Sequence, residues 1–175
     1  MNINDLKDGD LLFMSDSSEM SLNIQKSTGK FSHVAIYFSP YIFHASFKYG
    51  VVKQSLCDFF SEEKRIVFVY RYSLINLKKV KAEAEKYLGL PYNYSFLPDD
   101  KGFYCSEYIA TILPIFETIP MQFGDKKNEI SVYWNKYFKA LGVPAPLGKP
   151  GTNPGQLAAS KKLIPCGALE WEALP

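Results

Sequence analysis

The sequence predicts a single α+β domain, on the basis of its length, its aromatic content and a change in the spacing of its apolar residues. The chain has 175 residues, of which 47% are hydrophobic and 22% charged, so it can form one core and is too apolar to be disordered throughout. Aromatic residues make up 15%, which favours strands. Strand-like runs dominate up to residue 72, and helical spacing follows. We expect one domain over residues 1–175, with strands packed against helices.

Charge and hydropathy exclude several classes of protein. The 20 Lys and Arg residues nearly balance the 18 Asp and Glu residues, which is unlike the basic surface of a nucleic-acid-binding protein. No run of 18 apolar residues is present, so no transmembrane segment is predicted. The first residues do not resemble a signal peptide. The compartment stays open, cytoplasmic as written or periplasmic if a signal was removed, and no oligomeric state is predicted.

The first part of the chain is predicted to be mainly strands. Asp16 and Glu19 resemble a capping box, which starts a short helix that ends near Gly29. Ser39-Pro40 separates two β-rich runs and predicts a hairpin. The expected strands cover residues 11–14, 31–38, 41–46, 51–56 and 66–72. The charged run at residues 62–65 is interpreted as a solvated turn.

The second part is predicted to contain helices joined by irregular segments. Apolar residues recur at helical spacing over 77–88, and Gly89 and Pro91 end that helix. A second helix begins after Cys105 and ends before Pro114. Residues 142–155 are rich in Gly and Pro and are expected to be irregular, with Thr152 or Asn153 capping a last helix.

Cys105 is the first candidate for chemistry. The chain has three cysteines, widely spaced and in no CxxC pair, so a disulfide scaffold is not predicted. Cys105 lies where a loop becomes a helix, and the helix-start N–H groups and dipole favour a thiolate there. The alternative is a buried cysteine that only packs, and we assign this role to Cys57 and Cys166.

The two histidines of the chain are predicted to lie on one face of the hairpin. If Ser39-Pro40 is a two-residue loop, Phe38 faces Tyr41 and Ala35 faces His44. His33 and His44 are then diagonal neighbours on the same face, whereas an odd-length loop would separate them. Each could alternatively be a structural, hydrogen-bonded imidazole.

A thiol at a helix start beside two imidazoles suits a cysteine nucleophile. One imidazole accepts the thiol proton, and a second polar group orients that imidazole. The same three side chains could instead bind Zn²⁺ as a Cys-His-His set. No HExxH pattern is present, so a zinc-protease helix is not predicted, and we expect no cofactor.

Several short motifs occur in a fixed order along the chain. They are Gly9-Asp10-Leu11-Leu12-Phe13, Ser32-His33-Val34-Ala35-Ile36-Tyr37, Phe43-His44-Ala45, Gly50-Val51-Val52, Gly89-Leu90-Pro91-Tyr92 and Tyr104-Cys105-Ser106-Glu107. These motifs resemble those of the NlpC-like cysteine peptidases, a bacterial branch of the papain fold. Their order here is rotated, which resembles the circularly permuted YiiX/YebB-type branch related to lecithin:retinol acyltransferase. The resemblance implies a permuted papain-like fold in which an antiparallel sheet packs against helices.

The resemblance also implies roles for individual residues. Cys105 matches the nucleophile, His33 the general base and His44 the orienting residue. Tyr92 matches a tyrosine that lines the oxyanion side, and the alternative for Tyr92 is simple packing. Tyr104 is expected, with Tyr92, to border the oxyanion and substrate side. It stands where unpermuted members often carry Asp, which weakens the expectation of a peptidoglycan stem peptide as substrate.

Two further side chains are interpreted without a catalytic role. Glu107 is interpreted as a first-turn carboxylate that stabilises its helix. Gln25 is interpreted as a solvated helix residue.

We therefore expect a thiol hydrolase that cleaves an amide bond through a Cys105 thioester. The expected substrate is a small amide, peptide or acyl compound, such as a cell-wall peptide or an N-acyl amino acid. Two alternatives use the same fold: an acyltransferase that passes the thioester to an amine or alcohol, and a non-catalytic binding module.

Overall fold

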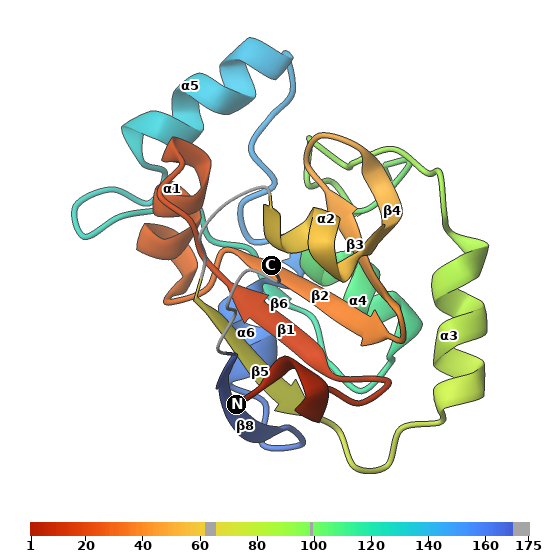
Figure 1. Ribbon diagram of the computed structural model, residues 1–175. Helices are drawn as coiled ribbons and strands as arrows, with labels where there is room; N and C mark the ends of the chain where they lie inside the picture. Colours follow the sequence, from red (N-terminus) through yellow and green to blue (C-terminus); the bar gives the residue numbers. More distant parts are fainter. Residues whose placement is uncertain (62–65, 99, 170–175) are drawn as a thin grey trace.

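A computed structural model describes residues 1–61, 66–98 and 100–169, and within them one six-stranded antiparallel sheet forms the centre (Figure 1). The strand order is β4-β3-β2-β1-β5-β8, and β6 and β7 form a separate two-stranded sheet. The strands are β1 (Leu11–Met14), β2 (His33–Phe38), β3 (Tyr41–Ser46), β4 (Gly50–Ser55), β5 (Val67–Arg71), β6 (Ile119–Pro120), β7 (Pro150–Gly151) and β8 (Ile164–Leu169). The predicted α+β class and antiparallel sheet are confirmed.

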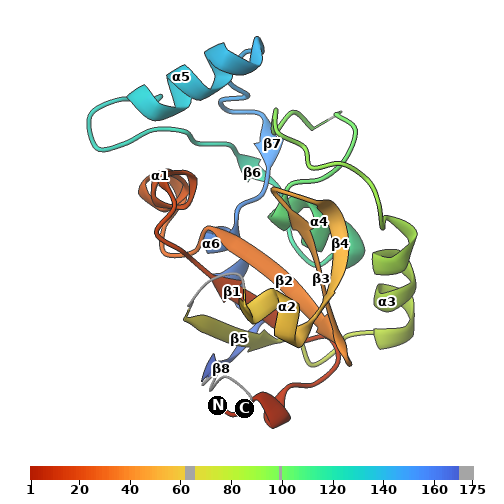
Figure 2. The ribbon, with the colours of Figure 1, turned by 45° about the horizontal axis from the view of Figure 1, so that its top comes forward.

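The helices lie on both faces of this sheet (Figure 2). They are η1 (Ile3–Asp5), α1 (Glu19–Thr28), α2 (Leu56–Ser61), α3 (Leu77–Lys86), α4 (Cys105–Ile112), α5 (Val132–Leu141) and α6 (Pro154–Ala158). In the described part of the chain, no helix has the length and apolarity needed to cross a membrane.

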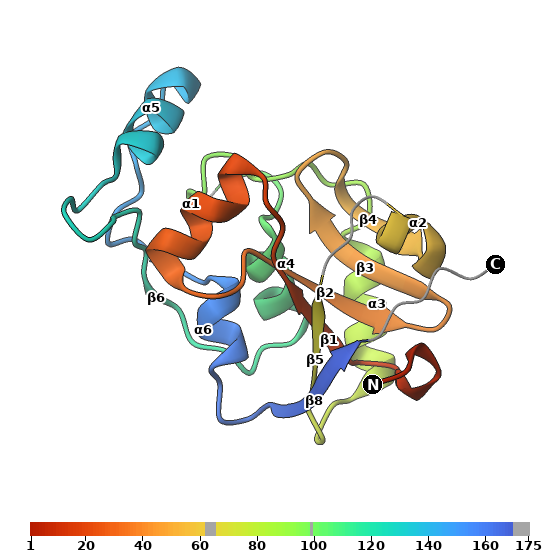
Figure 3. The same cartoon turned by 60° about the vertical axis from the view of Figure 1, so that its left-hand side comes forward.

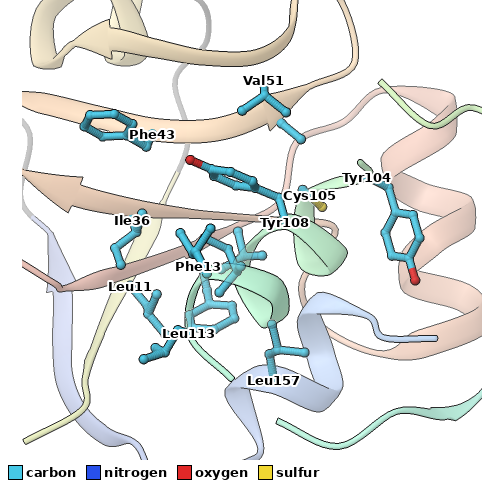
Figure 4. Close-up of a cluster of buried hydrophobic side chains, with 14 of the residues drawn as sticks. Leu11, Phe13, Ile36, Phe43, Val51, Tyr104, Cys105, Tyr108, Leu113 and Leu157 are labelled. Carbon is cyan, nitrogen blue, oxygen red and sulfur yellow. The ribbon is translucent and has the colours of Figure 1, made fainter. Parts of the chain in front are cut away.

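Strand β1 is buried on both faces, which explains its unbroken apolar sequence. Leu11 and Phe13 belong to a large core cluster that also contains residues of α3, α4 and α6. Leu12 and Met14 belong to a second cluster, which α2 closes with Phe59. Figure 4 shows Cys105 and Tyr108 of α4 among the side chains of the larger cluster. The start of α4 is therefore packed directly against the sheet.

The hairpin of β2 and β3 has the predicted register. Phe38 pairs with Tyr41 and Ile36 with Phe43, so Ser39-Pro40 is the two-residue connection. Strand β3 then pairs with β4, where His44 is opposite Val52. Because side chains alternate along a strand, this register directs His33 and His44 toward one face.

The predicted start of α1 is wrong by two residues. The N-cap is Ser18, whose side chain accepts a hydrogen bond from the Ser21 N–H. Asp16 instead accepts from the Ser18 N–H, which closes a local turn before the helix. The predicted end is confirmed, since Gly29 is the C-cap.

The other predicted helices are confirmed within a few residues. Helix α3 buries Val80 and Ala84 of its apolar stripe, and α4 begins at Cys105. Helix α6 is capped by Asn153, with Pro154 in the first turn. The charged run at 62–65 lies outside the described residues.

Helix α5 is an element that the sequence pattern did not predict, as are α2 and β8. It extends away from the sheet (Figure 3), and its inner side carries buried Trp134 and Phe138. The Trp134 indole N–H donates to Ser27 Oγ at 3.2 Å, and Tyr137 Oη donates to the Tyr94 carbonyl at 2.9 Å. Aromatic residues have only moderate helix propensity, so packing against α1 and the loop around Tyr94 stabilises this helix.

An ion pair between buried Asp10 and partly exposed Arg71 lies at the end of β1 and β2 opposite to the histidines. Asp10 is fully buried, and its two carboxylate oxygens accept from Arg71 Nε and Nη2, each at 2.7 Å. The Lys7 N–H also donates to Asp10 at 2.8 Å. Three hydrogen-bond donors thus hold Asp10. This structural role explains why an aspartate stands at this position of the motif.

Candidate active site

Cys105 is the first residue of α4 and is held there by a capped helix start. Tyr104, the N-cap, has extended backbone geometry, and its N–H donates to Glu107 Oε2 at 3.2 Å. Asn93 Nδ2 donates to the same oxygen at 3.4 Å. Glu107 therefore caps the helix start through hydrogen bonds, whereas the sequence predicts stabilisation by its charge; burial raises the pKa of Glu107 to about 7 and disfavours that charge.

The sulfur of Cys105 lies against the backbone on both sides of His33. Cys105 Sγ is 3.9 Å from the Ser32 carbonyl oxygen, and the Val34 N–H is directed at the thiol. Residue 105 is thereby placed at the start of β2, although more than seventy residues separate the two in sequence. The structure thus brings the nucleophile candidate to the strand that carries the base candidate.

Burial makes Cys105 a thiol rather than a thiolate at rest. Burial raises the pKa of Cys105 to about 11, while the N–H groups of Val34, Ser106 and Cys105 itself act in the opposite direction. The prediction that the helix start favours a resting thiolate is wrong, because desolvation of the charge outweighs the nearby N–H groups. A base must therefore remove the proton during the reaction.

His33 and His44 are in direct contact, as the predicted register requires. His33 Nε2 and His44 Nδ1 are 2.9 Å apart, and the two rings are nearly perpendicular. His33 is half-buried, whereas His44 is buried and packs edge-on against Phe59. Of the two rings, His33 is therefore the more accessible to solvent.

Gln54 extends this pair, and the sequence motifs did not single it out. Its Oε1 lies 2.6 Å from His44 Nε2. Gln54 is on β4, two residues beyond Val52, the partner of His44. The signal that could have found it is the pairing of β3 with β4: when the second strand begins at Gly50, residues 47–49 form a three-residue loop and Gln54 lies on the face of His44.

Tyr92 is buried beside Cys105. Burial and the charge of a Cys105 thiolate both raise the pKa of Tyr92 well above its usual value. Its ring also contacts Phe47 and Tyr94. Tyr92 thus lies close to the nucleophile candidate.

Tyr104 points its hydroxyl group elsewhere. Tyr104 Oη accepts from the Thr152 N–H at 3.1 Å, and burial raises its pKa to about 12. Figure 4 shows its ring directed away from Tyr108. Its hydroxyl therefore anchors the segment before α6, while its ring lines the cavity at Cys105.

Two cavities of different character meet at this site. The first, of about 50 Å³, contains Cys105 in its wall together with mostly apolar side chains such as Phe96, Met121 and Phe123. The second, of about 340 Å³, is an open cleft that contains both histidines. Their common wall residues are Ile24, Ser32 and Tyr92.

The described residues contain no group of three or more His, Cys, Asp and Glu side chains placed to hold a metal ion. His33 and His44 direct ring nitrogens at each other, and the distance between these atoms is that of a hydrogen bond. The arrangement therefore favours proton transfer over the Cys-His-His zinc alternative.

Comparison with known proteins identifies relatives of this chain. A family described as "permuted papain-like amidase enzyme, YaeF/YiiX, C92 family" matches residues 5–163. The uncharacterized protein YiiX of Escherichia coli K12 is 33% identical over 131 residues, which cover 69% of this chain and 62% of that protein. The match thus spans less than two thirds of the relative's length.

A solved structure extends the likeness to the whole fold. The crystal structure of a protein described as metalloprotein yiiX, from Escherichia coli O157:H7, superposes with a TM-score of 0.80 at 24% identity. The superposition covers 95% of this chain and 98% of the other. The predicted resemblance is confirmed: the chain belongs to the permuted papain-like amidase family of the YaeF/YiiX type.

Proposed function

We propose that this protein hydrolyses an amide bond through a thioester on Cys105, with His33 as general base. The observation that carries the proposal is the hydrogen-bonded pair of His33 and His44 at the point where the Cys105 sulfur lies against the backbone on both sides of His33. Family membership supports amidase chemistry but assigns no residue.

The steps follow from these positions. His33 accepts the thiol proton while the sulfur attacks the carbonyl carbon of the substrate. The carbon–nitrogen bond then breaks, and protonated His33 returns the proton to the leaving amine. Water, deprotonated by His33, attacks the thioester, which releases the carboxylic acid and restores the thiol.

The start of α4 supplies stabilisation for the negative oxygen formed during attack. The first N–H groups of a helix have no partner within the helix, so the Cys105 N–H suits the role of oxyanion donor. Tyr92 lies close to the sulfur and is our second candidate on this side. The Cys105 thiol loses its proton only when the base and the substrate are in place.

The two cavities suggest which part of a substrate binds in each. The apolar cavity at Cys105 suits the acyl side of the scissile bond, and the histidine cleft suits the polar leaving group. The cleft also contains Asp16 and Lys48, which can pair with the charges of an amino acid. We therefore propose N-acyl amino acids ahead of cell-wall peptides.

The solved relative is described as a metalloprotein, so the test includes a metal arm. In this chain the donor set does not fit a metal site, because the described residues provide no suitable cluster and the histidines pair with each other. We derive no step through a metal.

The test is to trap the thioester. Purified protein is mixed with N-acyl amino acids of varied chain length and with cell-wall stem peptides, then quenched in acid and analysed by mass spectrometry. We expect an acyl adduct on Cys105 and a free amino acid product. Cys105→Ala should lower turnover by at least about 10³-fold, since removal of a nucleophile leaves only binding and oxyanion effects.

Cys57→Ala and Cys166→Ala are matched controls, because these thiols are exposed and half-buried and neither lines the site. Turnover that persists in Cys105→Ala would overturn the proposal. Turnover lost with a chelator and restored by Zn²⁺ would also overturn it. Transfer of the acyl group to an added amine in place of water would identify the acyltransferase alternative.

A further inference from the structure

We propose that Gln54 is a positioning residue that sets the tautomer of both histidines and so leaves His33 Nδ1 as the basic nitrogen. The inference rests on the proposed function, because it concerns the base of that reaction. It is carried by two hydrogen bonds in series, from His33 to His44 and from His44 to Gln54.

The position of each proton along these two hydrogen bonds follows from the last acceptor, Gln54 Oε1. A carboxamide oxygen only accepts, so the 2.6 Å contact of Gln54 Oε1 requires a proton on His44 Nε2. A neutral imidazole carries one proton, so His44 Nδ1 is then an acceptor. The 2.9 Å contact to His33 Nε2 requires that this nitrogen donates. His33 Nδ1 then holds a lone pair and can accept the thiol proton.

The opposite arrangement would prevent catalysis. If the Gln54 amide were turned, its NH₂ group would donate to His44 Nε2. The proton of each histidine would then move to its other ring nitrogen. His33 would then carry its proton on Nδ1 and offer no lone pair there. The orientation of one amide therefore decides which nitrogen of His33 is basic.

The fold holds the three side chains in line. His44 and Gln54 lie on the same face of the β3–β4 pair, separated by one diagonal step of the register. His44 is buried and its ring packs edge-on against Phe59, which limits its rotation. Gln54 is half-buried, so its contact with His44 is partly shielded from water.

Other titratable side chains border the same cleft. Asp16, Lys48 and Tyr92 line it with the histidines, from the loop before α1, the β3–β4 turn and the loop before α4. Because these groups can change the charge of the histidines, a pH profile alone does not isolate the effect of Gln54. A measurement that reports the position of protons is therefore needed as well.

Nitrogen NMR provides that measurement, because His33 and His44 are the only two histidines in the chain. Long-range ¹H–¹⁵N spectra of the full-length protein distinguish the two neutral tautomers, and His44→Gln assigns the signals. At a pH where titration shows both rings neutral, we expect both to carry the proton on Nε2. Both protons on Nδ1 would overturn the inference.

Substitutions at Gln54 test its role. Gln54→Leu should give a mixture of tautomers, whereas Gln54→Glu keeps an acceptor oxygen and should retain the proton on Nε2 in both rings. Gln25→Leu makes the same chemical change at a glutamine of α1 and should leave the spectra unchanged. Thermal unfolding and far-UV circular dichroism identify any variant that fails to fold.

Iodoacetamide labelling provides a second readout. We expect Gln54→Leu to slow labelling of Cys105 by about tenfold, by analogy with the loss of the hydrogen-bond partner behind a metal-binding histidine. Labelling of exposed Cys57 should not change and serves as internal reference. Unchanged spectra and unchanged Cys105 labelling in a folded Gln54→Leu variant would overturn the inference.

These outcomes separate the inference from the proposed function. The tautomers are read without substrate, so the expected spectra can be observed even if Cys105→Ala still turns over. Conversely, a trapped Cys105 thioester with both protons on Nδ1 would sustain the function and remove Gln54 from it.

Discussion

Strands β1 and β2 carry a cluster of polar side chains at each end. The two clusters differ in their burial and in their hydrogen-bond partners. At one end Asp10 is fully buried and accepts two hydrogen bonds from Arg71 and one from the Lys7 N–H. At the other end His33 contacts His44, and both line an open cleft. Both ends match short motifs of the family.

The comparison separates a structural motif residue, Asp10, from a candidate functional one, His33. Asp10 is paired inside the protein, so it has no access to a substrate. His33 is half-buried and lines the cleft, and the backbone of its neighbours Ser32 and Val34 contacts the Cys105 sulfur. Motifs of one family thus include residues with two physical roles, and burial and partners distinguish them.

Within this comparison, the largest effect on activity is expected from His33→Ala. Loss of a general base lowers turnover by about 10²–10⁴-fold. Because His33 borders the cleft, water can replace it as partner of His44, and the free energy of unfolding should fall by only about 1 kcal/mol. Turnover, or the rate of Cys105 labelling, measures the loss of activity. Urea unfolding measures the change in stability. A variant with unaltered turnover would contradict the assignment of the base.

The opposite result is expected from Asp10→Ala. The substitution removes the acceptor of Arg71 and of the Lys7 N–H, but water can reach the partly exposed guanidinium, so the free energy of unfolding should fall by about 1–3 kcal/mol. Urea unfolding measures this loss. At temperatures where the variant is folded, its Cys105 labelling rate should match that of the unchanged protein.

The double variant Asp10→Ala/Arg71→Met controls for the charge left behind. It should recover part of the lost stability, since replacing both partners of an ion pair costs less than removing one. A loss in Asp10→Ala of less than about 1 kcal/mol would contradict the structural role of the pair.

A smaller effect, dependent on pH, is expected from Glu107→Gln. Burial raises the pKa of Glu107 from 4.5 to about 7, and Asp100 adds to the shift. The folded state therefore holds a proton that the unfolded chain has lost, so this contribution to stability is complete below about pH 4.5 and is lost as the pH rises through about 7.

Gln keeps the oxygen that caps α4 but carries no charge. Glu107→Gln should match the unchanged protein near pH 4.5 and exceed its free energy of unfolding by about 1–3 kcal/mol above pH 7. Urea midpoints across this range provide the measurement. An equal pH dependence in both proteins would show that ionising Glu107 does not lower the stability of the folded state.

Local sequence patterns were sufficient for much of the site. The even loop at Ser39-Pro40 determines which face His33 and His44 share, because side chains alternate along a strand. The loop before Cys105 and the apolar spacing after it locate the start of α4. These predictions depend on neighbours a few residues apart, and such patterns are visible in the chain itself.

The tertiary structure decided the features that depend on distant neighbours. Cys105 is a resting thiol because the packed core excludes water from it, and helix position alone predicted the opposite. Gln54 joins the histidines only through the pairing of β3 with β4, and α5 is stabilised by contacts with α1. Burial and cross-strand contacts arise when segments far apart in sequence meet, so no local pattern records them.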